Sequence, residues 1–247
     1  MKPLGTLRSQ GDCHGCKWRS EGFFCDLPEA DLRQFSSFKI THVYPKGTTL
    51  FTEGQPAIGI YMLCAGRVKL STYSAEGRSL IVRVAEPGEV LGLSACVAGV
   101  AHEGSAQVIT DCQVNFIQRS DFLGLLRDSS AVAMSAVREL SNLYHKAHTQ
   151  ICSLGLSVSA SDKLAKLLLG WSKTTDDSGA GVRVRMIYTH EEVAEMIGTS
   201  RETVTRTLKM FKDRGLIKIV GTDLLIPDKK RLSGAVGRVY PPRQEVT

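Results

Sequence analysis

The feature that most constrains this chain is a run of apolar and small side chains that repeats every 3.5 residues between residues 129 and 158. The steps along the run alternate between four and three residues, at Ala133, Val137, Leu140, Tyr144, Ala147, Ile151, Leu154 and Val158. This period places every member on one narrow stripe of an α-helix, and such a stripe needs a second helix to bury it. A helix of this length would extend about 45 Å.

We expect this helix to pair with the same helix of a second copy of the chain in a coiled-coil homodimer. The residues expected at the dimer contact are Val137, Leu140, Tyr144, Ala147, Ile151 and Leu154. The alternative is a long helix that packs on its own domain.

The region before this helix has a different residue pattern. From residue 31 to residue 118, glycines separate short runs of strand-forming residues. Strands of ordinary length are predicted at Thr48–Thr52, Ile58–Cys64, Arg67–Tyr73 and Ser79–Val84. Glycine-containing turns separate them. This spacing predicts an all-β barrel or roll.

Beyond the long helix, the sequence predicts two short helices joined by a tight turn. Thr189 and Glu192 have the spacing of a capping box at the start of the first helix. That helix ends at Gly198-Thr199, and Ser200 then caps a second helix that ends near Gly215. Two short helices with such a turn form a helix-turn-helix.

The outward face of the second helix indicates what it binds. Six residues are expected there as DNA contacts: Ser200, Arg201, Glu202, Thr205, Arg206 and Lys209. Arginine is the commonest partner of guanine, and glutamate can accept a hydrogen bond from cytosine. The alternative is a solvated helix face with pairs such as Glu202–Arg206. The capped helix and the turn that precede this face favour DNA.

The flanking segments fit a winged helix. Val182–Tyr188 alternates apolar side chains with Arg183 and Arg185 and is predicted as a half-buried strand. Those arginines either contact phosphates or form a solvated face. Leu216–Val220 and Leu224–Ile226 are predicted as the hairpin of a wing, and residues 228–247 as a loosely ordered basic tail.

Composition narrows the class of protein. The 247 residues carry a formal net charge of +6, which is compatible with a nucleic-acid partner. The N-terminus has no signal peptide, no window is apolar enough to span a membrane, and the seven cysteines then point to a reducing, cytoplasmic location. The sequence has no Walker A loop, GxSxG elbow or HExxH motif, so we do not expect an enzyme.

The recognition segment, Ile197–Arg206, closely resembles that of the CRP/FNR family of bacterial transcription regulators. The resemblance implies an α+β chain in four parts. These are a cysteine-rich arm over residues 1–30, a β-roll sensor domain resembling a cyclic-nucleotide-binding domain over 31–128, a dimerisation helix over 129–158, and a winged helix-turn-helix over 159–247. It also implies a DNA-binding homodimer that acts with RNA polymerase. Arg201, Glu202 and Arg206 match the base-reading residues of the CRP branch, which implies palindromic sites with GTGA-like half-sites.

The sensor region departs from the CRP branch at two positions. The resemblance places Leu93 where that branch has the glutamate for the ribose hydroxyl, and Gly104 where it has the arginine for the phosphate. A cyclic phosphate would lose its charged partner. We therefore expect the fold of a cyclic-nucleotide-binding domain without cAMP or cGMP as its ligand.

The N-terminal arm resembles the cysteine cluster of FNR-type sensors. Cys13 and Cys16 form a CxxC motif and Cys25 follows. The resemblance implies a [4Fe–4S] cluster that senses oxygen, NO or redox state, with a fourth ligand from the β-roll. Cys112 is the candidate, although Asn115 stands where the resemblance places that ligand, and an offset of three residues on a strand points to the opposite face.

Other functions remain open for the arm and for the chain. Thiolates also suit zinc, for which His14 is an additional candidate, and a CxxC motif can act as a thiol-disulfide switch. The cysteines can also lack a sensing role, in which case a small-molecule effector would bind in the β-roll. The rival classes are a CxxC-based oxidoreductase and a nucleotide-binding regulator that does not bind DNA. Apart from the possible ligand role of Cys112, we expect Cys64, Cys96, Cys112 and Cys152 to be buried, inert thiols.

Overall fold

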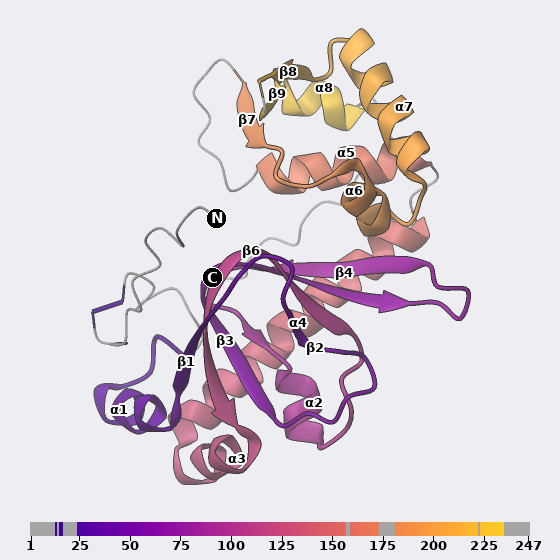
Figure 1. The fold of residues 1–247 in the computed structure, drawn as a ribbon. Coiled ribbons are helices and arrows are strands. Elements are labelled where there is room, and N and C mark those ends of the chain that lie inside the picture. Colours follow the sequence, from indigo (N-terminus) through magenta and orange to yellow (C-terminus); the bar gives the residue numbers. More distant parts are fainter. Residues whose placement is uncertain are drawn as a thin grey trace. The chain divides into compact units, whose positions relative to one another are not determined.

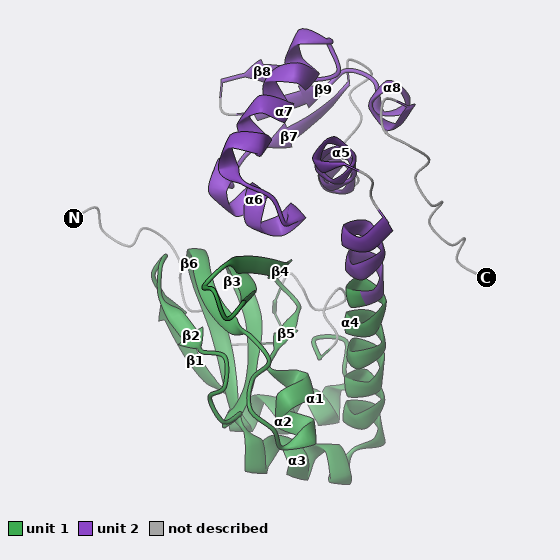
Figure 2. Cartoon of the chain, turned by 90° about the vertical axis from the view of Figure 1, so that its right-hand side faces the viewer, with its two compact units in different colours: residues 1–147 green, residues 148–247 purple. Residues whose placement is uncertain are grey.

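The computed structural model describes residues 13, 15–16, 24–156, 159–172, 181–221 and 223–234 (Figure 1). The chain divides into two compact units, residues 1–147 and 148–247 (Figure 2). Within the described residues, no helix is long and apolar enough to cross a membrane.

The first unit is built on one antiparallel sheet. Its strands are β1 (Ile40–Tyr44), β2 (Thr49–Phe51), β3 (Gly59–Tyr73), β4 (Ser79–Ala85), β5 (Val90–Leu91) and β6 (Ser105–Gln118). The order across the sheet is β1-β6-β3-β4, with β2 paired to β6 and β5 paired to β3. This is the β-roll that the glycine spacing predicts.

Helices accompany the roll where the sequence predicts strands alone. They are α1 (Glu29–Phe38), α2 (Leu93–Ala98) and α3 (Arg119–Asp128). The reading of residues 31–118 as strands is therefore wrong at α1 and α2. In α1, Leu32 and Phe35 are three residues apart, so both point into the core on one face of the helix.

Strand β3 corrects a second expectation. The sequence predicts two strands, Ile58–Cys64 and Arg67–Tyr73, and the structure has one continuous strand. Gly66 lies between them with φ +87°, and the pairing with β6 shifts register on both sides of it. A side chain at this position would bring its Cβ within 2.3 Å of the Asp111 carbonyl oxygen and 2.5 Å of the Cys112 sulfur. The glycine thus lets the strand bend through a place that resembles a turn.

Two hydrophobic clusters divide the side chains of β3 by strand alternation. Ile60 and Met62 pack with Cys13, Phe24 and Cys25 of the arm and with residues of α1, α2, α3 and α4. We call this the arm cluster. Tyr61 and Leu63 pack with residues of β2, β5 and β6, which we call the roll cluster. The described arm residues Cys13, Phe24 and Cys25 therefore pack on one face of the sheet.

The long helix predicted at 129–158 is α4 (Ser130–Leu156), and residues 157–158 lie outside the described residues. The second unit contains α5 (Ala160–Trp171), β7 (Val182–Arg185), α6 (His190–Ile197), α7 (Arg201–Asp213), β8 (Lys218–Val220), β9 (Asp223–Ile226) and α8 (Lys229–Gly234). The strand order is β7-β9-β8, with β8 and β9 as the predicted hairpin. The segment predicted as a loosely ordered tail, residues 228–247, begins with helix α8, whose Leu232 is buried. Residues 235–247 lie outside the described residues.

Candidate DNA-binding surface and sensor residues

Local hydrogen bonds define the helix-turn-helix. The Thr189 hydroxyl accepts from the Glu192 N–H at 3.1 Å, and the Glu192 carboxylate accepts from the Thr189 N–H at 2.9 Å. At the other end of α6, Gly198 takes the left-handed conformation with φ 62° and its N–H donates to the Ala194 carbonyl. The Ser200 hydroxyl then accepts from the Thr203 N–H at 3.3 Å and starts α7. The predicted capping box, turn and second cap are confirmed.

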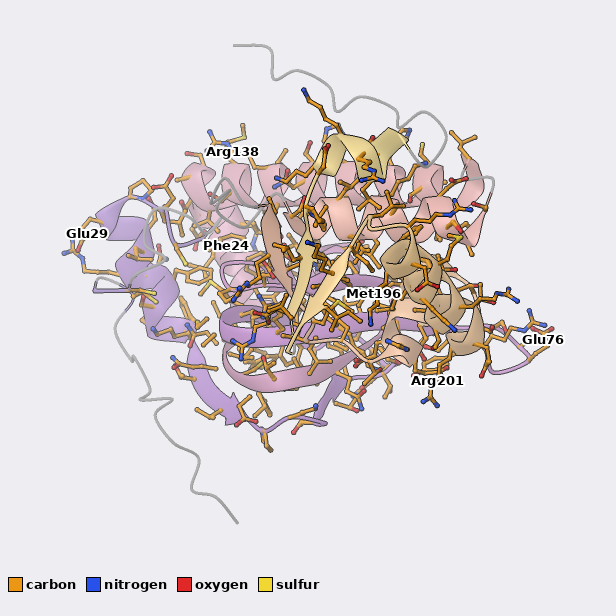
Figure 3. The ribbon with its side chains drawn as sticks, turned by 90° about the horizontal axis from the view of Figure 1, so that it is seen from above. Phe24, Glu29, Glu76, Arg138, Met196 and Arg201 are labelled. Atoms are coloured by element: carbon orange, nitrogen blue, oxygen red, sulfur yellow. The ribbon has the colours of Figure 1, made fainter. Side chains whose placement is uncertain are left out.

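The two faces of α7 differ in burial. Its inner side is formed by Val204, Thr207, Leu208 and Phe211, all buried. The six predicted DNA contacts are all exposed: Ser200, Arg201, Glu202, Thr205, Arg206 and Lys209. Figure 3 shows the Arg201 side chain pointing away from the ribbon. The structure thus brings together the full set that the sequence places on this face.

The charge of Glu202 is stabilised by the helix start. Its own backbone N–H and the Ser200 hydroxyl hold the pKa of this carboxyl below its usual range, and the charge of Arg201 adds to the effect. Glu202 is fully exposed, so it presents an ionised acceptor beside two guanidinium groups at neutral pH. An acceptor next to forked donors is the combination that distinguishes cytosine from guanine in the major groove.

Thr205 has partners within the protein. Its hydroxyl donates to the Arg201 carbonyl oxygen at 3.0 Å and lies 2.9 Å from His190 Nδ1. Because a hydroxyl has one proton, it accepts from the imidazole N–H when it donates to the carbonyl. His190, which shows no partner pattern in the sequence, thereby links α6 to α7. Thr205 can then offer DNA only an acceptor lone pair or its methyl group.

The arginines of β7 also have a partner in the unit. Val182 and Val184 are buried and Arg183 and Arg185 are exposed, as the alternation predicts, although the strand ends at Arg185. Arg183 forms an ion pair with Asp223 of β9, with 3.8 Å between Nη1 and Oδ2. This pair favours a role in the sheet over phosphate contact for Arg183.

The predicted dimer seam on α4 contains exposed apolar side chains. Val137, Tyr144 and Ile151 are 57%, 68% and 69% exposed, which is unusual for residues of this size. Ala147 is also exposed, and Leu140 and Leu154 are partly buried. Leu140 packs against the arm cluster. The two rows of the heptad therefore differ: Val137, Tyr144 and Ile151 are all exposed, whereas in the other row Leu140 and Leu154 are partly buried.

The predicted cysteines are separated into two places. Cys13 and Cys25 are buried in the arm cluster, and Cys16 is half-buried. The Lys39 ammonium of α1's C-terminal flank donates to the Cys13 sulfur at 2.9 Å. Cys112 belongs to the roll cluster, where its single thiol proton can be donated to the carbonyl of Thr110 at 3.0 Å or to that of Arg67 at 3.3 Å. The structure does not bring Cys112 to the other three, as its strand parity indicates.

Cys64, expected to be an inert thiol, lies on strand β3 and is partly buried. Burial raises its pKa to about 12, and the charges of Cys25, Cys13 and Cys16 add to the shift while Lys39 opposes it. These interactions place Cys64 in the neighbourhood of the arm cysteines. Within the described residues, no group of three or more His, Cys, Asp or Glu side chains is arranged to hold a metal ion.

The remaining described cysteines are separate from this group. Burial raises the pKa of Cys96 and of Cys112 to about 11, so both are poor nucleophiles at neutral pH. The Cys152 sulfur lies 3.9 Å from His148 Nδ1 on α4. His14, the additional zinc candidate, lies outside the described residues.

The roll has its own charged group beside α4. Glu89 forms ion pairs with Arg83 and with Lys146 of α4, the latter at 2.5 Å. Glu139 of α4 is only 1% exposed, and neither of its carboxylate oxygens has a hydrogen-bond partner among the described residues. Burial raises the pKa of Glu139, the charge of Glu89 adds to this, and the Val90 backbone, Lys146 and Arg83 oppose it.

The two positions that depart from a cyclic-nucleotide pocket are closed. Leu93 is buried at the start of α2. At Gly104, a Cβ would lie 2.9 Å from the Ser71 carbonyl oxygen, so a larger side chain would require the backbone to move. Neither position has a charged group that could hold a ribose hydroxyl or a phosphate.

Two family models match the chain in the order of its units. A cyclic nucleotide-binding domain matches residues 41–129, and a Crp-like helix-turn-helix domain matches residues 162–235. The chain belongs to the CRP/FNR family of transcription regulators. As a CRP/FNR-type protein it is a DNA-binding transcription regulator, and regulators of this family act as dimers.

Known CRP-type proteins resemble it over most of its length. The CRP-like cAMP-activated global transcriptional regulator of Mycobacterium tuberculosis is 28% identical over 192 residues, which cover 77% of this chain and 85% of that protein. The cAMP-activated global transcriptional regulator CRP of Haemophilus influenzae is 25% identical over 190 residues, which cover 75% of this chain and 83% of that protein. These relatives are regulators and not enzymes.

Solved structures share the fold. FixK2 from Bradyrhizobium japonicum matches with a TM-score of 0.72 at 22% identity, over 82% of this chain and 99% of that one. The c-di-GMP-responsive regulator CLP from Xanthomonas campestris matches with a TM-score of 0.72 at 20% identity, over 81% of this chain and 100% of that one. The predicted α+β architecture of β-roll followed by helix-turn-helix is confirmed.

Proposed function

We propose that this CRP/FNR-type regulator binds palindromic DNA with GTGA-like half-sites as a homodimer, and that its N-terminal cysteines hold a [4Fe–4S] cluster that reports oxygen, NO or redox state. The observation that carries the DNA-binding part is the exposed face of α7, where Arg201, ionised Glu202 and Arg206 stand together at the capped end of the helix. That end of a recognition helix enters the major groove.

The dimer follows from the exposed apolar row on α4. Val137, Tyr144 and Ile151 recur every seven residues, so a second copy of the same helix can cover them. A two-fold dimer would place its recognition helices about 34 Å apart, one turn of duplex, which matches a palindromic site. RNA polymerase is the proposed partner at the promoter, and the cytoplasm is the proposed location.

The signal is assigned to the arm because thiols are soft ligands and two of the arm's three cysteines are buried in the arm cluster. Cys13 and Cys25 lie in the arm cluster, Cys16 is half-buried, and the Lys39 ammonium beside Cys13 would offset thiolate charge. Thiolates suit an iron–sulfur cluster, which would supply a redox-sensitive and oxygen-sensitive centre when bound. The protein's own part is to present the sulfurs, exclude bulk water and couple the arm to α1 and α4, whose residues share the arm cluster.

The coupling runs through packed elements. A change at the arm would alter the packing of Phe24 on Phe35 of α1 and Phe122 of α3, whose ring centroids lie 5.2 and 5.8 Å away. Val132 and Ala136 of α4 belong to the same cluster. Since α4 carries the dimer seam, the signal and the DNA affinity form one two-state equilibrium, and DNA should reciprocally favour the signalled state.

The test is anaerobic purification followed by DNA binding. A broad absorbance near about 400 nm with about four irons and four sulfides per chain is expected. A GTGA palindrome should bind more tightly than a scrambled duplex, with an affinity that changes on exposure to air. Binding without sequence preference would overturn the DNA assignment, and a colourless, metal-free protein with the same affinity in air would overturn the cluster.

A small-molecule effector in the β-roll is the second candidate, favoured by buried Glu139. Its two unpartnered oxygens lie near the Glu89–Arg83–Lys146 group, and an effector with hydrogen-bond donors would satisfy them. Closed Leu93 and Gly104 argue against cAMP in that role. Thermal-shift screening of the metal-free protein separates this candidate from the first.

A further inference from the structure

His190 is the first residue of α6, and its side chain contacts the recognition helix α7. Its Nδ1 lies 2.9 Å from the hydroxyl of Thr205, which is 15 residues further along the chain. The same hydroxyl donates to the Arg201 carbonyl oxygen at 3.0 Å. Because a hydroxyl has a single proton, the imidazole is the donor in the first contact, with its proton on Nδ1. The two helices of the motif are thus joined by a hydrogen bond of defined direction.

This hydrogen bond selects the side-chain rotamer of Thr205. In a helix, threonine divides between two χ1 rotamers, because its hydroxyl can bond a carbonyl of the preceding turn. The donor from α6 favours the rotamer that turns the hydroxyl toward His190. The methyl group then takes its own fixed place on Cβ. His190 therefore determines where that methyl group lies.

The methyl group is the part of Thr205 that is left for a partner. Thr205 is exposed on the same face of α7 as Arg201 and Arg206. Its hydroxyl uses its proton and one of its two lone pairs within the protein. A group that approaches this face from the major groove would meet the methyl group before a hydroxyl that is turned toward the protein.

Thr207 shows that a threonine of α7 needs no second helix to satisfy its hydroxyl. The Thr207 hydroxyl donates to the Thr203 carbonyl oxygen at 2.7 Å, as that of Thr205 does to Arg201, and Thr207 is buried. The imidazole contact of Thr205 is therefore additional, and it occurs on the exposed side of the helix. This favours a positioning role for His190 over simple satisfaction of a polar group.

The chemistry of a fixed methyl group complements that of its neighbours. Arg201, Glu202 and Arg206 supply donors and an acceptor, which suit G·C pairs. Thymine is distinguished in the major groove by its C5 methyl group, and a threonine methyl is one of the groups that contact it. Thr205 can thus add an apolar contact that the charged residues of this face cannot make.

We propose that His190 is a positioning residue for base recognition, which holds Thr205 so that the Thr205 methyl group contacts the C5 methyl of a thymine in the half-site. This inference rests on the proposed binding of palindromic sites and adds a base contact to it. His190 itself touches no base. The specificity of α7 then depends on a side chain of α6.

The test removes single methyl groups from the DNA. The preferred palindrome is selected from a random duplex pool with the full chain, purified anaerobically, and each thymine of the half-site is replaced in turn by deoxyuridine, which lacks only the C5 methyl. Fluorescence anisotropy gives the affinity. For wild type, we expect one replacement to weaken binding about fourfold per half-site, the effect of one buried methyl group. A half-site without such a position would overturn the inference.

Two substitutions separate the methyl group of Thr205 from its hydroxyl. Thr205→Ser keeps the hydroxyl and removes the methyl, so it should abolish the deoxyuridine effect. Thr205→Val has a methyl group in both places and should retain the effect. The reverse pattern would mean that the hydroxyl contacts the base, which contradicts the proposal.

Substitutions of His190 test the positioning role. His190→Ala should reduce the deoxyuridine effect to less than about twofold, whereas His190→Asn, whose amide can donate from a similar place, should retain most of it. In the Thr205→Val protein, His190→Ala should not change the effect, because valine needs no partner to present a methyl group. If His190→Ala weakens binding to all duplexes alike and leaves the deoxyuridine effect intact, His190 has a structural or phosphate-binding role and the inference is wrong.

The selection step separates failure of the inference from failure of the proposed function. A selected site other than a GTGA palindrome would overturn the GTGA assignment alone, and the deoxyuridine series would test His190 on the selected site. A GTGA palindrome without a deoxyuridine effect would overturn the inference alone. Binding without any sequence preference would overturn both.

Discussion

The Lys39 ammonium donates a hydrogen bond of 2.9 Å to the Cys13 sulfur, joining the residue that follows α1 to the CxxC motif of the arm. This contact spans 26 residues of sequence, and neither residue indicates it by spacing. It provides a positive charge beside the first cysteine of the CxxC motif.

The Lys39 contact predicts a change in the redox behaviour of the loaded protein. Hydrogen bonds to ligand sulfurs and net charge set the potential of an iron–sulfur cluster. Lys39→Met should therefore lower the reduction potential by some tens of millivolts, measured by spectroelectrochemical titration. Lys46→Met, which removes a lysine from an exposed turn of the same unit, should leave it unchanged. A Lys39→Met potential equal to that of wild type would contradict a role for this charge.

Arg206 should carry sequence discrimination. Arg206→Ala should cost about 1–3 kcal/mol of preference for a guanine over the other bases, because a bidentate contact is lost. Fluorescence anisotropy with a GTGA palindrome and single-base variants measures this. Lys212→Ala, at the C-terminal end of the same helix, removes the same charge and should weaken binding to all duplexes alike. An equal effect of the two substitutions on every sequence would show that Arg206 contacts only phosphate.

The exposed row on α4 predicts the oligomeric state. Ile151→Glu should shift the protein from dimer to monomer, because a carboxylate would replace an apolar side chain at the centre of a coiled coil. Size-exclusion chromatography with light scattering gives the mass. Asn142→Glu introduces the same charge on the opposite face of the helix and should leave the dimer intact. An Ile151→Glu protein that stays dimeric would place the interface elsewhere.

Glu139 predicts how stability depends on pH. Its folded pKa lies above that of the unfolded chain, so the protonated form is favoured by folding. Its contribution is complete at pH below the unfolded value and is lost as pH rises through the folded pKa. Glu139→Gln should raise the free energy of unfolding at pH 8 by an amount on the order of 1 kcal/mol and flatten its fall between pH 4 and pH 8. Urea titrations at several pH values measure the free energy of unfolding and its pH dependence. Parallel pH profiles for wild type and Glu139→Gln would refute the assignment to Glu139.

The backbone near Glu139 only partly compensates for the burial of its carboxylate. The Val90 N–H lies close enough to lower its pKa slightly, yet neither oxygen meets hydrogen-bond geometry among the described residues. A buried carboxylate with this incomplete environment is costly in the absence of a ligand.

Local determinants made the helix-turn-helix predictable. Thr189 with Glu192, Gly198, and Ser200 each act within a few residues of their own position, and the structure has every one of these contacts. The α4 seam is equally local, because a heptad repeat is a property of one helix. Burial of Leu140 against the arm cluster was not predictable, because it depends on elements distant in sequence.

The sensor half was less predictable for a related reason. The bulge at Cys64 depends on the register between β3 and β6, and the sequence alone shows only a glycine between two apolar runs. With Gly66 taken as part of a turn, the sequence predicts two strands in place of β3, and Cys64 falls at the end of the first. Strand parity, which is local, already indicated that Cys112, the candidate fourth ligand, faces away from the arm, and the structure places it in the roll cluster. The bulge at Cys64 depends on strand pairing, which is not local.

The bend at Gly66 limits how this sensor domain can vary. The carbonyl of Asp111 and the sulfur of Cys112 fill the space that any side chain at position 66 would need, and φ +87° disfavours every residue with a Cβ. In a saturation-mutagenesis library selected only for folded protein, position 66 should accept glycine alone, and position 112 should accept only small residues. A change in the ligand specificity of this roll would therefore have to come from substitutions at positions flanking the bend, because position 66 itself tolerates only glycine.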